Sequence, residues 1–274
     1  MKKQSLLSLV CLAGGIAAFL LRLLQNKTGF EGSTGLPVAG DLFALLLPPV
    51  LLVFAVVLAV LAREPKSAVK PVFPEDFSTK SSALLSIPVA GILMMGLSGM
   101  LLALANISPD TVPVSGGSSP QVQLLFGATA LIPALALLSA FSACRQQGAR
   151  ESSLRVSRKY DPATLLLIPP VGLVIRLVLS YRIYSIDPVL ERYYVELLAL
   201  VFMTLAFYRL SSFAFQAGNP FRFTLYAGLA VILSCAALAD GGALPDLLFY
   251  AGGAVTLLGT LLMQPQTPPR KLSQ

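Results

Sequence analysis

Eight long apolar stretches divide this sequence, and they constrain its fold more than any other feature. A helix of about 20 apolar residues crosses the hydrocarbon core of a bilayer. Only 12% of the residues are charged, against about 25% in soluble domains, so too little polar surface remains for a fold in water. We therefore expect an all-α, polytopic integral membrane protein with about eight transmembrane helices. The expected spans are roughly residues 5–25, 40–62, 83–106, 122–143, 163–181, 189–210, 223–239 and 246–263.

Lysines and arginines are concentrated in every second connection between these stretches, which predicts the orientation of the chain. Short cytoplasmic loops carry an excess of Lys and Arg. The connections at 107–120 and 240–245 contain neither residue. We therefore expect both termini in the cytoplasm, and we assign the net charge of +7 to topology rather than to nucleic-acid binding. The inner side then holds 15 of the 20 basic residues: Lys2, Lys3, Arg63, Lys66, Lys70, Lys80, Arg145, Arg150, Arg155, Arg158, Lys159, Arg209, Arg222, Arg270 and Lys271.

Two similar motifs indicate an internal repeat. The sequence Arg-Leu-Leu at Arg22 resembles Arg-Leu-Val at Arg176. About 20 residues after each arginine, Asp41 and Glu196 each precede the pattern Leu-x-Ala-Leu. Because four spans separate the two copies, both halves enter the membrane from the same side, as in transporters built from parallel repeats.

This repeat predicts the domain organisation. We expect two parallel four-helix halves joined by a basic cytoplasmic linker and followed by a cytoplasmic tail. The short loops and the lack of a long polar stretch favour a bacterial cytoplasmic membrane, and so a multi-pass cell-membrane protein. The ranges are 1–143 for the first half, 144–162 for the linker, 163–264 for the second half and 265–274 for the tail.

Arg176 and Glu196 are charged residues inside apolar stretches. Such residues usually face the interior of a helix bundle or pair with each other. If Asp187 caps the sixth helix and Pro188 is its first residue, Glu196 lies at a depth similar to that of Arg176. One hypothesis is an ion pair, or a wet cavity open to the outside. The alternative is that Arg176 extends to the interface while Glu196 pairs with Arg192 one turn earlier.

Arg22 and Asp41 are the corresponding residues of the first half, and they lie nearer the membrane edge. If the repeat holds, both pairs approach the axis between the halves and form an outward-facing polar vestibule. The alternative for Asp41 is a capping residue at the start of its helix.

Tyr181, Tyr184, Tyr193 and Tyr194 lie at the same outer boundary. Tyrosine is enriched at membrane interfaces, where its ring is in an apolar environment and its hydroxyl in a polar one. The pattern is typical of an aromatic belt, and the alternative is stacking against a ligand.

The sequence contains no signature of catalysis. It has no histidine, the commonest metal ligand and general base. Its three cysteines are scattered, and the P-loop, GxSxG, HExxH and Rossmann patterns are all missing. We therefore predict no enzyme activity, catalytic residue, cofactor or metal site.

Two functions remain open for a protein of this kind. The first is a small-molecule or ion carrier, or the membrane subunit of a transporter, with a polar site near Arg176, Glu196, Arg22 and Asp41. The second is a non-transporting sensor, scaffold or assembly factor whose basic inner loops dock a protein partner or anionic lipid. The lipid bilayer is the expected partner in both cases, and the small-molecule ligand is not identified by the sequence.

Overall fold

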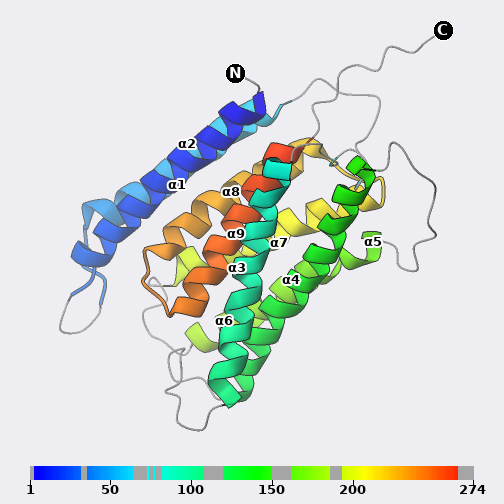
Figure 1. Cartoon of the computed structure of the whole chain (residues 1–274). Coiled ribbons are helices and arrows are strands. Elements are labelled where there is room, and N and C mark those ends of the chain that lie inside the picture. Colours follow the sequence, from blue (N-terminus) through cyan, green and yellow to red (C-terminus); the bar gives the residue numbers. More distant parts are fainter. Residues whose placement is uncertain are drawn as a thin grey trace.

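The computed structural model describes residues 3–31, 36–63, 73, 77, 82–107, 120–149, 162–185 and 193–264. The regular elements in this part of the chain are helices, and they form an elongated bundle (Figure 1). They are α1 (Lys3–Thr28), α2 (Leu42–Ala62), α3 (Ser82–Ile107), α4 (Pro120–Ala149), α5 (Pro162–Leu165), α6 (Ile168–Tyr184), α7 (Tyr194–Ala214), α8 (Pro220–Leu238) and α9 (Leu244–Met263).

Each expected span contains a helix, and seven helices are long and apolar enough to cross a membrane. The fifth span differs, because it is divided into the short α5 and the 17-residue α6. The division falls just before Pro169 and Pro170, which have no N–H to donate to a preceding turn and instead occupy the start of α6. By contrast, Pro48 and Pro49 lie inside an uninterrupted α2.

With seven helices of this length and composition, the protein is a multi-pass membrane protein in contact with the lipid bilayer.

The helices begin where the sequence provides local capping groups. The Asp41 carboxylate accepts a hydrogen bond of 2.9 Å from the backbone N–H of Ala44 at the start of α2. Asn219 caps α8 in the same way, accepting from the backbone N–H of Arg222 at 3.2 Å, and Pro220 follows as the first helical residue. Both arrangements satisfy donors that have no partner inside the helix.

The backbones of α3 and α9 approach each other closely. A Cβ atom on Gly91 would lie 2.5 Å from the backbone nitrogen of Thr256, and one on Gly252 would lie 2.6 Å from the carbonyl oxygen of Gly91. Small residues of this kind let two helix backbones approach each other. In the expected domain organisation, α3 belongs to the first half and α9 to the second. Since the two helices are in contact, the two halves pack together in one bundle. The duplication itself stays a prediction.

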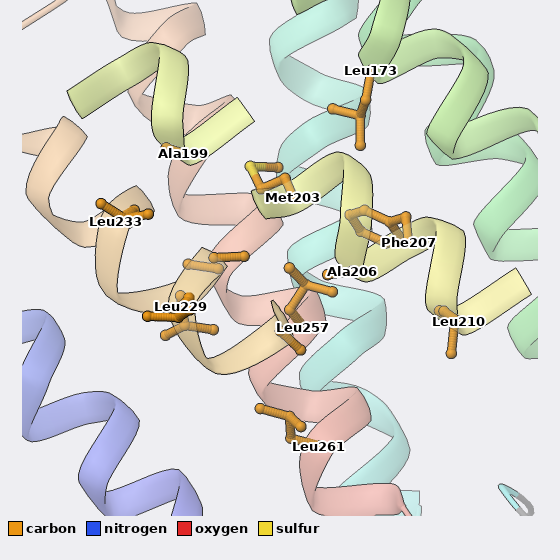
Figure 2. Close-up of a cluster of buried hydrophobic side chains, with 14 of the residues drawn as sticks. Leu173, Ala199, Met203, Ala206, Phe207, Leu210, Leu229, Leu233, Leu257 and Leu261 are labelled. Atoms are coloured by element: carbon orange, nitrogen blue, oxygen red, sulfur yellow. The ribbon is translucent and has the colours of Figure 1, made fainter. Parts of the chain in front are cut away.

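The middle of the bundle is apolar. Side chains of α7 point toward α8 and α9 (Figure 2), and Met203 and Phe207 are at most 1% exposed. On the outside, α1 and α2 lie along one flank of the bundle (Figure 1) and pack on α8. Only Leu47, Leu58 and Ala62 of α2 are buried, and Leu45, for example, is 73% exposed, because this surface faces lipid.

Five phenylalanines close one end of the bundle, and we call them the phenylalanine cluster: Phe73, Phe77, Phe141, Phe213 and Phe223. Phe73 and Phe77 come from the connection between α2 and α3 and are 3% and 0% exposed. The ring centroids of Phe77 and Phe213 are 5.2 Å apart, and those of Phe73 and Phe141 are 6.0 Å apart. The backbone N–H of Phe73 also donates to the carbonyl of Phe213. The cluster therefore ties this connection to the ends of α4 and α7 and to the start of α8.

Candidate functional site

Arg22 lies in the last two turns of α1 and is fully buried. Its Nε donates to Oδ1 of Asp240 at 2.6 Å, and its Nη1 donates to Oε1 of Gln25 at 3.0 Å. The amide nitrogen of Asn26 donates to the same Asp240 oxygen and to the carbonyl of Ala239, both at 3.0 Å. These bonds fasten the end of α1 to the end of α8.

Arg176 lies about two turns from the end of α6 and is 1% exposed. Its Nη2 donates to Oδ1 of Asp246 at 2.9 Å, and its Nη1 donates to the carbonyl of Phe126 at 3.4 Å. The guanidinium carbon lies 3.8 Å from the centre of the Phe249 ring and 4.9 Å from that of Phe126, in the range of cation–π attraction. Its Nε has no hydrogen-bond partner among the described residues.

The two buried arginines therefore meet carboxylates at the two ends of one turn. Asp240 follows α8, and Asp246 lies in the first turn of α9. Gly241 between them has a φ of +67°, a conformation that glycine adopts without steric penalty. Residues 240–246 thus connect α1 and α6, which are far apart in the sequence.

Glu196 lies in the first turn of α7, next to this turn. Its Oε2 accepts from the Tyr184 hydroxyl at 2.8 Å, and its Oε1 accepts from the Tyr250 hydroxyl at 2.9 Å. The two tyrosines belong to α6 and α9. Glu196 therefore links three helices through neutral donors. We call the whole set the polar network: Arg22, Gln25, Asn26, Arg176, Tyr184, Glu196, Asp240, Asp246 and Tyr250.

Three of the four tyrosines singled out from the sequence contact this network or belong to it. The rings of Tyr184 and Tyr193 are stacked, with centroids 4.1 Å apart. The guanidinium carbon of Arg22 lies 5.3 Å from the centre of the Tyr194 ring. Tyr181 differs, because 58% of its surface is exposed on the outside of α6.

The expected ion pair between Arg176 and Glu196 is not the one that forms. The carboxylate bonded to Arg176 is that of Asp246, because the start of α9 brings Asp246 and the Phe249 ring against the guanidinium. Both oxygens of Glu196 instead receive tyrosine hydroxyls. The alternative partner, Arg192, lies outside the described residues.

Asp41 takes the alternative role stated above, as the cap of α2. Its other oxygen accepts from the hydroxyl of Thr28 at 2.8 Å. Arg22, its expected counterpart, instead pairs with Asp240. Asp41 therefore stabilises the connection between α1 and α2, and it does not pair with the buried Arg22.

Sequence reasoning missed Asp240, Asp246 and Tyr250. The position of the two aspartates in the sequence could have identified them, because they lie at or next to the ends of the connection 240–245. That connection is assigned to the same membrane face as both arginines. That connection has no Lys or Arg of its own to neutralise them. No comparable signal identified Tyr250, because its role depends on the distance between α7 and α9.

Compared with protein-family models, with curated proteins and with solved structures, the chain matches none of them. A function is therefore argued from the chemistry of the site rather than from kinship.

Proposed function

We propose that this protein is a small-molecule or ion carrier, or the membrane subunit of one, and that the polar network is its binding region. Ionisable groups inside transmembrane segments usually mark a substrate pathway, an ion pathway or a proton relay. The network joins α1 at one end of the chain to α6, α7, α8 and α9. A movement of any of these helices changes the contacts of its charged groups.

The observation that carries the proposal is the surplus carboxylate. The network contains two cations, Arg22 and Arg176, and three carboxylates, Glu196, Asp240 and Asp246. Each arginine is paired with an aspartate, which leaves Glu196 with hydroxyl donors. Glu196 is half-buried and has no paired cation among the described residues. A charge held partly out of water without a counter-charge is unfavourable, so a positively charged group arriving from solution would be stabilised there.

Transport by the reconstituted protein tests the proposal. We expect proteoliposomes of the full chain to give charge-movement currents on a solid-supported membrane for at least one member of a panel of protons, Na⁺, amino acids, carboxylates and sugars. Glu196→Gln should abolish the current. Tyr181→Phe, which changes an exposed hydroxyl at the same end of α6, should leave it unchanged. Currents equal to those of protein-free liposomes across the panel would refute transport of these solutes.

The packed interior favours a second candidate, a sensor, scaffold or assembly factor without transport. Apolar side chains such as Met203, Phe207 and Leu257 are buried in the middle of the bundle (Figure 2). The partner in this case would be anionic lipid or a protein at the basic end of the bundle, where Arg63 and Arg222 lie.

Retention of anionic lipid through detergent extraction, measured by native mass spectrometry, distinguishes the second candidate. If the protein is a scaffold of this kind, the amount of retained lipid should fall in Arg63→Gln and in Arg222→Gln. The proteoliposomes should then give no current in the transport assay. Lipid retention that these variants leave unchanged would contradict it.

A further inference from the structure

We propose that Glu196 binds an exchangeable proton, and that Tyr184 and Tyr250 carry its hydrogen bonds in both protonation states. Each carboxylate oxygen lies within 2.9 Å of one tyrosine hydroxyl. The three residues belong to α6, α7 and α9, so the proton would lie where three helices meet. The proposal extends the proposed function by naming the ion that a carrier built on this network would couple to.

The charges around Glu196 favour the addition of one positive charge. From α6 it faces Tyr184 and Arg176, and from α9 it faces Tyr250 and Asp246. Arg176 and Asp246 neutralise each other at 2.9 Å, and Tyr250 is 3% exposed. Asp240, which follows α8, is paired with Arg22 of α1. Binding one proton therefore makes the group around Glu196 neutral without disturbing either ion pair.

A proton fits this geometry better than a metal cation does. A metal cation needs several oxygen ligands that direct lone pairs at it simultaneously. Here both oxygens of Glu196 already receive hydroxyl hydrogens, from Tyr184 and Tyr250. A proton needs one carboxylate oxygen.

The protonation step balances with the residues present. The Glu196 carboxylate takes one proton from water and becomes a carboxylic acid, which carries one O–H donor. The tyrosine hydroxyl facing that oxygen then changes from donor to acceptor, because a phenol can do either. Release of the proton to water reverses the change, and no other reactant is consumed.

Exposure indicates the side from which the proton arrives. Tyr184 is the last residue of α6 and is half-buried, with its ring stacked on Tyr193. Tyr250 is buried in the second turn of α9, beside Phe249 and Arg176. Glu196 thus has a hydroxyl near the end of the bundle on one side and a hydroxyl in its interior on the other. The proton enters past Tyr184.

Infrared difference spectroscopy on the purified full chain in nanodiscs, switched between acidic and alkaline buffer, tests the proposal. Among the carbonyl bands of the protein's protonated carboxyl groups, we expect one reversible band that is lost in Glu196→Gln and retained in Glu31→Gln, a carboxylate outside the helices. Tyr184→Phe and Tyr250→Phe each remove one hydrogen bond and should shift the band. They also test the proposal if Glu196→Gln does not fold.

The outcomes separate proton binding from transport. The proposal would be overturned if Glu196→Gln removed no band from the spectrum, or if neither tyrosine variant shifted the band that Glu196→Gln removes. A Glu196 band in a protein whose liposomes are silent would support the proton site while removing the carrier function. Solute currents with no Glu196 band would support the carrier function and refute the proton site.

Discussion

At the scale of single residues, the two buried arginines constrain this protein most. Arg22 and Arg176 are at most 1% exposed, and each is bonded to an aspartate. The sequence identified both arginines because they interrupt apolar runs. It did not identify their partners, which lie 218 and 70 residues away along the chain.

Removal of Asp246 should be strongly destabilising, because it leaves Arg176 buried and unpaired. We expect Asp246→Asn to lower the free energy of unfolding by about 3 kcal/mol, measured by SDS titration in mixed micelles. A double-mutant cycle of Asp246→Asn with Arg176→Met should give an interaction energy of about 1–3 kcal/mol. The matched cycle of Glu196→Gln with Arg176→Met should give a smaller value. Equal values in the two cycles would contradict the pairing.

Removal of the Asp41 cap should have a smaller effect that does not reach the polar network. Asp41→Ala loses the bond to the N–H of Ala44 and should cost about 1 kcal/mol of stability. Asp41→Asn keeps an accepting oxygen and serves as the control. If Asp41→Ala abolished the currents or the infrared band of Glu196, then Asp41 would belong to the site after all.

At the scale of helices, close approach and aromatic packing hold the bundle together. Gly91 and Gly252 let α3 lie directly against α9, and the phenylalanine cluster fixes the connection between α2 and α3. The sequence predicted the helices because long apolar runs are a local signal. Which helices meet through their glycines depends on the folded bundle.

A methyl group at the contact between α3 and α9 should force the helices apart. In Gly91→Ala the new Cβ would meet the Thr256 backbone nitrogen at 2.5 Å, and such overpacking costs about 1–3 kcal/mol. Gly96→Ala is the matched control on the same helix, since its nearest neighbour there is the Ala134 Cβ at 3.5 Å. Thermal unfolding in detergent compares the two, and equal melting temperatures would contradict the close contact.

The phenylalanine cluster should contribute substantially to stability. Phe77 is fully buried against Phe73 and Phe213, so Phe77→Ala should lower the free energy of unfolding by about 3–5 kcal/mol. Phe77→Leu keeps most of the volume and should cost less. Phe215→Ala, at a residue 51% exposed near the end of α7, is the control expected to be almost neutral. A Phe77→Ala variant as stable as Phe215→Ala would show that this end is not held by the cluster.

At the scale of the whole molecule, the two ends of the bundle differ in charge. Among the described residues, all the carboxylates lie at the end that carries the polar network: Glu31, Asp41, Glu196, Asp240 and Asp246. Arg63, Arg209 and Arg222 lie at the end with the phenylalanine cluster, where α2 and α7 end and α8 begins. Lys27 and Arg182 lie at the end with the polar network, where the carboxylates outnumber the basic residues. An excess of Lys and Arg marks the cytoplasmic side of a membrane protein, so the polar network should face outward.

Cysteine labelling in intact cells tests this orientation. Leu36→Cys, in the connection between α1 and α2, should react with a membrane-impermeant maleimide from outside. Ala217→Cys, in the turn between α7 and α8, should react only after permeabilisation. Both positions are exposed, and the unmodified chain, whose Cys11 and Cys144 are buried, is the background control. The reverse labelling pattern would invert the topology and place the polar network on the cytoplasmic side.

The sequence by itself determined the class of the protein and the approximate positions of its helices, and it offered the cap as one of two roles for Asp41. These depend on apolar runs and on groups a few residues apart, which any reading along the chain can find. Only the tertiary structure decided that Arg22 meets Asp240, that Arg176 meets Asp246 and that Glu196 is bonded by two tyrosines. Those contacts depend on which helices pack together, and in a bundle of uniformly apolar helices the sequence pattern favours no particular neighbour.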